Sequence, residues 1–85
     1  MNTLTYEEQV QELIDKEVSY CHTQTDYKLI VRHNKNKYSF DTYQRYHVDD
    51  TMAYVVMTAA NKVLKERGYI ANTQGYYDTN CQIRQ

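Results

Sequence analysis

The chain has 85 residues, of which 41% are hydrophobic and 25% charged, and these fractions are typical of one small globular domain spanning 1–85 rather than of a disordered tail. No apolar run approaches the roughly 20 residues needed to cross a bilayer, and the N-terminus lacks the basic and apolar regions of a secretory signal. The formal net charge of −1 argues against a polyelectrolyte binder. We therefore expect a cytoplasmic protein that has no membrane partner.

Residues 5–22 are predicted to form an amphipathic helix. Thr5 and Glu8 have the spacing of a capping box, in which each side chain accepts a hydrogen bond from the other residue's backbone N–H. Three acids fall on the polar face, where they suit both solvent and the positive end of the helix dipole: Glu8, Glu12 and Asp15. The apolar face consists of Tyr6, Val10, Leu13, Ile14, Val18 and Cys21, which recur at steps of 4, 3, 1, 4 and 3.

The next segment changes period and predicts a β-hairpin. Tyr27, Leu29 and Val31 alternate with Lys28, Ile30 and Arg32, as in a half-buried strand, and 38–43 alternates in the same way. The run 33–37, which contains two asparagines, is typical of a turn between two such strands. This interpretation places Ile30 and Tyr43 on the outer face of the sheet.

The clearest predicted element is a second helix, with Asp49 or Asp50 as its N-cap and Gly68 at its C-terminal end. We expect Val56, Ala60 and Val63 to face the core. The whole apolar set is Met52, Val55, Val56, Ala59, Ala60, Val63 and Leu64, at helical spacing.

After this helix, the sequence predicts a short strand over 69–71, a turn over 72–75 and a further strand over 76–83. Two amphipathic helices and an alternating sheet can hide their apolar faces only against one another. We therefore expect an α+β fold in which both helices pack on one face of a small antiparallel sheet, in the order α-β-β-α-β(β).

Motifs that would carry chemistry are missing from the sequence. Both glycines stand alone, so there is no glycine-rich phosphate loop, and the spacings of the three histidines and two cysteines match no standard zinc site. We expect no enzyme activity, no catalytic residue, no cofactor and no metal. Cys21 and Cys81 are predicted to be free thiols, partly buried rather than bridged.

Charge and tyrosine content suggest a binding surface. Residues 1–22 carry five acids and one lysine, whereas residues 26–48 carry five bases and two acids. Ten tyrosines are present, and tyrosine combines a rigid contact area with a polar tip, as binding interfaces require. We predict that Tyr6, Tyr27, Tyr38 and Tyr69 are core residues and that Tyr43, Tyr46, Tyr54 and Tyr76 are exposed. The predicted partner-binding residues, on or just after the hairpin, are Arg32, Lys35, Lys37, Tyr43, Arg45 and Tyr46.

The chain is short and rich in Tyr, Asn, Lys and Gln. In this composition it resembles accessory proteins of bacteriophages and mobile elements, such as anti-CRISPR and host-takeover inhibitors. The resemblance implies a protein that covers a surface of a host nuclease, polymerase or protease, and it assigns no site residue. Two alternatives stay open. The basic hairpin could bind nucleic acid by stacking Tyr43 and Tyr46 on bases, or an exposed strand edge or tyrosine face could form a homodimer.

Overall fold

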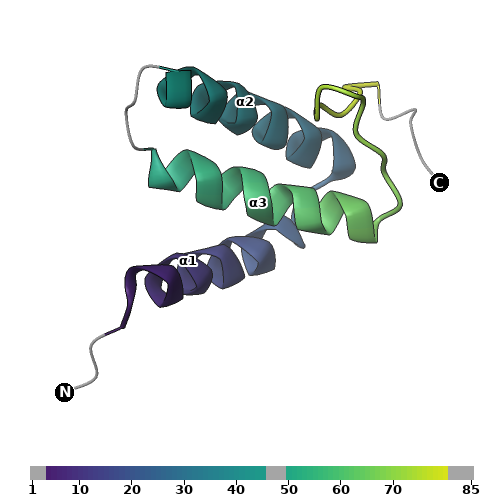
Figure 1. Cartoon of the computed structure of the whole chain (residues 1–85). Helices are drawn as coiled ribbons and strands as arrows, with labels where there is room; N and C mark the ends of the chain where they lie inside the picture. Colours follow the sequence, from purple (N-terminus) through teal and green to yellow (C-terminus); the bar gives the residue numbers. More distant parts are fainter. Residues whose placement is uncertain (1–3, 46–49, 81–85) are drawn as a thin grey trace.

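Helix α3 (Thr51–Glu66) lies between helices α1 (Tyr6–Cys21) and α2 (Asp26–Arg45) and packs against both (Figure 1). The computed structural model describes residues 4–45 and 50–80, and in these ranges it contains three helices and no strand. The predicted α+β fold with an antiparallel sheet is therefore wrong, and the fold is all-α. The core is formed where the three helices meet and includes Ile14, Leu29, Ile30, Val63 and Leu64.

Helix α1 begins where the sequence predicts. The Thr5 hydroxyl accepts a hydrogen bond from the Glu8 backbone N–H at 3.1 Å, and the Glu8 carboxylate accepts one from the Thr5 N–H at 3.2 Å, which confirms the capping box. Ile14 and Cys21 are buried, with Val10 and Val18 packed beside them, while the acids of the polar face are exposed. The bounds of this helix follow from the sequence, and four of the six residues of its predicted apolar face pack toward the core, whereas Tyr6 and Leu13 are exposed.

Helix α3 is also confirmed, including both of its ends. Asp50 is the N-cap and accepts a hydrogen bond from the Ala53 N–H at 3.0 Å. At the other end, Gly68 adopts the left-handed conformation with φ 93°. The N–H groups of Gly68 and Tyr69 donate to the carbonyls of Lys65 and Leu64, each at 3.0 Å, in a Schellman motif. The predicted core residues Val56, Ala60 and Val63 are buried.

The predicted hairpin is instead the helix α2. Thr25 caps it, since its hydroxyl accepts a hydrogen bond from the Lys28 N–H at 3.3 Å. Leu29 and Ile30 are adjacent and both fully buried, which one face of a helix allows but an alternating, half-buried strand does not. Ile30 therefore lies in the core and not on an outer sheet face. Asn36, expected in the turn, lies inside the helix and donates to the Arg32 carbonyl at 2.8 Å.

The segment after α3 turns back toward α2 (Figure 1). Its predicted turn at 72–75 is confirmed by a hydrogen bond of 2.9 Å from the Gly75 N–H to the Asn72 carbonyl. The two predicted strands do not form in the described residues 69–80, and positions 81–83 of the second lie outside the described residues. Tyr69 and Tyr77 are buried and anchor this segment, which we call the tail, to the helices.

The ends of all three helices meet at Asp26. Its carboxylate accepts hydrogen bonds from the Arg67 guanidinium at 2.8 Å and from the Tyr69 hydroxyl at 2.5 Å. Arg67 also lies 3.4 Å from the carbonyls of Cys21 and His22, at the end of α1. None of the three helices, over the residues described, is both long and apolar enough to cross a membrane.

Candidate functional site

The six predicted partner-binding residues do not form one cluster. Arg32 and Lys35 share a side of α2, whereas Lys37 follows Arg32 by five residues and so points roughly 140° away around the helix. The backbones of Tyr43 and Arg45 belong to the last turn of α2, but their side chains, and all of Tyr46, lie outside the described residues. The predicted hairpin places these residues together, whereas the helix separates Lys37 from Arg32 and Lys35.

Arg32 and Lys35 line a surface groove between the C-terminal end of α1 and the outward side of α2. The groove has a volume of about 430 Å³. We call it the basic groove and define it by Tyr20 of α1 and by Tyr27, Lys28, Val31, Arg32 and Lys35 of α2. These α2 residues share a side because they recur at steps of three and four.

Arg32 is held in place within the basic groove. Its guanidinium lies 2.6 Å from the Glu17 carboxylate of α1 and 5.1 Å from the centre of the Tyr20 ring. This ion pair and cation–π contact join α1 to α2. Lys28 and Lys35, in contrast, are exposed and form no ion pair with the residues that the structure describes. The groove therefore presents two free cations beside aromatic surface.

Three of the four tyrosines predicted to be core residues are exposed. The exposed fractions are 63% for Tyr6, 59% for Tyr27 and 68% for Tyr38, whereas Tyr69 is buried as predicted. The strand phase assigned to 27–43 explains the errors at Tyr27 and Tyr38, since the helix turns both toward solvent. Tyr54 is exposed, as predicted, and Tyr76 is half-buried under Lys37.

A second hollow lies on the opposite side of α2, where the tail meets α2 and α3. This pocket has a volume of about 320 Å³, and we call it the tail pocket. It is lined by His33 and Lys37 of α2, Thr58, Asn61 and Lys65 of α3, and Gly75 of the tail, together with Met57 and Ala71.

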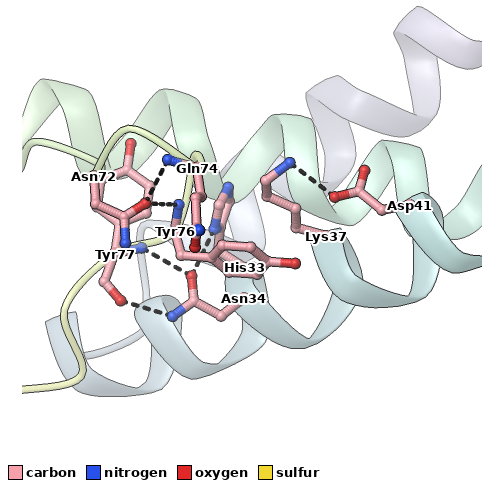
Figure 2. Close-up of polar contacts among 8 residues, drawn as sticks. All are labelled: His33, Asn34, Lys37, Asp41, Asn72, Gln74, Tyr76 and Tyr77. Atoms are coloured by element: carbon pink, nitrogen blue, oxygen red, sulfur yellow. Dashed lines mark hydrogen bonds and ion pairs between the residues drawn. The ribbon is translucent and has the colours of Figure 1, made fainter.

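Asn34 holds the tail against α2 (Figure 2). Its side-chain amide donates to the Tyr77 carbonyl at 2.7 Å, and its side-chain oxygen accepts from the Tyr77 N–H at 3.0 Å. Both backbone polar groups of the buried Tyr77 are thereby satisfied. The Tyr77 ring packs edge-to-face on His33 at 4.9 Å, and its hydroxyl donates to Asn61 at 2.5 Å. Burial raises the pKa of the Tyr77 hydroxyl, which keeps it a donor.

His33 is a polar side chain that is only 2% exposed. Burial lowers its pKa, the hydrogen bond to Asn34 opposes that shift, and the charge of Lys37 lowers the pKa further. Asn34 Oδ1, which already accepts from the Tyr77 N–H, lies 3.1 Å from His33 Nδ1, so Nδ1 carries the proton of the neutral ring. The Nε2 atom is then an acceptor.

Lys37 lines the tail pocket where the tail crosses α2. Its ammonium lies 3.1 Å from the Asp41 carboxylate and 5.4 Å from the centre of the Tyr76 ring. The tail reaches this position because Gly75 has φ 88° and no side chain, and a Cβ there would lie 2.7 Å from Lys37 Cε.

Sequence reasoning missed the contacts of His33 and Asn34, and it grouped Lys37 with Arg32 and Lys35 rather than with the tail. His33, Asn34 and Lys37 recur at steps of one and three, which is helical spacing, but polar residues at such spacing indicate a solvated face unless the covering segment is known. That segment is the tail, 43 residues beyond Asn34. The helical spacing of these polar residues can therefore be read from the sequence, but the tail segment that covers them cannot.

Cys21 is a free thiol, as predicted, and it is fully rather than partly buried. Cys81 lies outside the described residues. Burial raises the Cys21 pKa and the charge of Glu17 raises it further, with Arg32 and Arg67 opposing. Among the residues described, no three His, Cys, Asp or Glu side chains gather in a way that would hold a metal ion.

Comparisons of the chain with protein-family models, with curated proteins and with solved structures found no match. The candidate sites are therefore interpreted from their own geometry and charge.

Proposed function

We propose that this chain is a protein-binding module whose basic groove docks an acidic, amphipathic segment of a partner protein. The observation that carries the proposal is the pairing of exposed aromatic surface with free positive charge. Tyr27 and Val31 are exposed beside Lys28 and Lys35, which have no ion-pair partner among the described residues. Aromatic anchors beside charged residues are typical of interface hot spots.

The charge of the groove selects the chemistry of the partner. Carboxylates would pair with the free cations Lys28 and Lys35, and apolar side chains would cover Tyr27 and Val31. The contact of Arg32 with Glu17 and Tyr20 orders the wall of the groove before binding, so less side-chain entropy is lost when a partner docks.

Nucleic acid fits this groove less well. Binding to a phosphate backbone usually involves several cations, about 6–10 phosphate contacts in a strong DNA binder. Here Glu17 already neutralises Arg32, and the acids on the polar face of α1, among them Glu12 and Asp15, lie on the helix that forms one wall. These acids would repel a phosphate backbone that passed over α1.

The narrower hypothesis, an inhibitor from a bacteriophage or mobile element that covers a host nuclease, polymerase or protease, is supported by composition alone and stays a prediction. A second copy of the chain is the other occupant that the charges allow, since the acidic face of α1 could enter the basic groove of a neighbour. The experiment below separates these outcomes.

The test is a selection of peptides from a random display library on the purified chain. We expect enriched peptides to combine Asp or Glu with apolar or aromatic residues. A Lys28→Glu/Lys35→Glu variant should bind a selected peptide at least about tenfold more weakly. Lys16→Glu/Lys62→Glu is the matched control, because both residues are exposed and outside the groove and the net charge changes equally.

Equal loss of binding in the two double variants would contradict the proposal, since it would show attraction to net charge alone. Sub-micromolar binding of unstructured DNA or RNA at physiological salt, lost in the Lys28→Glu/Lys35→Glu variant, would replace it with the nucleic-acid alternative. A dimer in sedimentation that this variant alone disrupts would identify a second copy as the occupant.

A further inference from the structure

The tail pocket contains a buried histidine whose outer nitrogen has no partner. His33 Nδ1 faces Asn34, and no hydrogen bond to Nε2 is present. Every fully buried side-chain nitrogen or oxygen of the described residues has a hydrogen-bond partner, so Nε2 must be accessible. Because His33 is 2% exposed and lines the tail pocket, Nε2 opens into that pocket.

The other polar walls of the pocket are cationic or neutral. Lys65 is exposed and forms no ion pair with the described residues, while Lys37, which also lines the pocket, shares its charge with Asp41. Thr58 and Asn61 add neutral polar groups, and Met57 and Ala71 add apolar surface. The pocket volume of about 320 Å³ lies at the lower end of the range for small-molecule sites.

From this arrangement we infer that the tail pocket binds a small organic acid that also carries a hydroxyl group. The acid group would pair with Lys65, which has no ion-pair partner among the described residues. The hydroxyl would donate to His33 Nε2, and the body of the ligand would contact Met57 and Ala71. This ligand differs in size and chemistry from the peptide proposed for the basic groove, and the two sites lie on opposite sides of α2.

The pocket exists because the tail covers it. Asn34 fixes the Tyr77 backbone, Tyr77 buttresses the His33 ring, and Gly75 gives Lys37 room to lie over Tyr76. His33 and its neighbours are thus held before a ligand arrives, as an organised binding site requires.

The experiment is an NMR titration of the full chain at neutral pH with para-hydroxybenzoate, benzoate and phenol. Para-hydroxybenzoate should give saturable shifts of the His33 ring and of Asn61 and Gly75. Benzoate lacks the hydroxyl and phenol lacks the acid, and each should bind roughly tenfold more weakly. Para-hydroxyphenyl phosphate is titrated in parallel, to distinguish a phosphoric from a carboxylic acid as the preferred group.

Two variants localise the binding. Lys65→Met should weaken para-hydroxybenzoate roughly tenfold, while Lys62→Met, which removes an exposed lysine from the same helix outside the pocket, should leave it unchanged. Absence of saturable shifts with either hydroxylated acid up to about 10 mM would overturn the inference, as would equal weakening by both variants. Peptide binding at the basic groove is measured separately, so the two proposals can fail independently.

Discussion

On the side of α2 that forms the basic groove, Tyr27 and Val31 are exposed and Lys28 and Lys35 are free of ion pairs with described residues. On the opposite side, His33 is buried and packs against the ring of Tyr77, a residue of the tail. One side of the helix is thus exposed, and the other is covered by the chain itself. The difference shows that a helix of low apolar content can be stabilised by polar contacts with a distant segment while its outer side stays exposed.

The largest expected loss of stability comes from a substitution in the apolar core that holds the three helices together. Val56→Asp would bury an unpaired charge in α3 and should cost about 4 kcal/mol or more, a large part of the total for a domain of this size. Thermal unfolding measures the loss. Met52→Asp on the exposed first turn of α3 is the control and should change stability by less than about 0.5 kcal/mol. If Val56→Asp melted within a few degrees of the wild type, the packing of α3 described here would be wrong.

The covered side of α2 can be opened by one substitution. Asn34→Ala removes two hydrogen bonds to the Tyr77 backbone and should cost about 1–3 kcal/mol, confined to the tail. Amide hydrogen exchange should speed up over residues 72–80 and stay slow in α3. Asn36→Ala is the matched control, because the Asn36 side chain bonds only within α2 and alanine favours a helix more than asparagine does. Equal exchange rates in the two variants would show that Asn34 does not hold the tail.

A smaller effect is expected from pH. Because the folded-state pKa of His33 is lowered, the unfolded chain binds more protons there, and the stability due to the neutral ring is complete above about pH 6.5 and decreases as pH falls below it. The wild type should therefore lose more stability than His33→Gln between about pH 7.5 and about pH 5.5. His22 and His47 are common to both chains, so they cancel in the difference. Parallel pH profiles would place His33 in solvent.

Helices α1 and α3 could be predicted from the sequence because their signals are local. The Thr5–Glu8 capping box, the Asp50 cap, Gly68 and the apolar spacing all lie within the elements that they define. Helix α2 could not be predicted in this way. The apolar residues Leu29 and Ile30 are followed by the polar residues His33 and Asn34, which are covered only because the tail packs on them. Without that long-range contact, alternation of Tyr27, Leu29 and Val31 resembles a strand, and Asn34 and Asn36 resemble a turn.

The same reason explains why the structure brings together only some of the predicted binding residues. The prediction for Arg32 and Lys35 rests on charge, which does not depend on the fold, and both line the basic groove. The prediction for Lys37 rests on the same ground, but Lys37 lies on the other side of α2, because the helical phase separates it from them. Tyr27, assigned to the core by the strand phase, is instead exposed and lines the groove.

The most direct test of the proposed function is the affinity of a selected acidic peptide for Tyr27→Ala and Tyr38→Ala, measured by isothermal titration calorimetry. Both tyrosines are exposed on the same side of α2, three turns apart, but only Tyr27 lines the basic groove. We predict that Tyr27→Ala costs about 2 kcal/mol, or roughly thirtyfold in Kd, and that Tyr38→Ala changes Kd by less than about twofold. Unchanged affinity for Tyr27→Ala, or an equal loss for both variants, would contradict the assignment of partner binding to the basic groove.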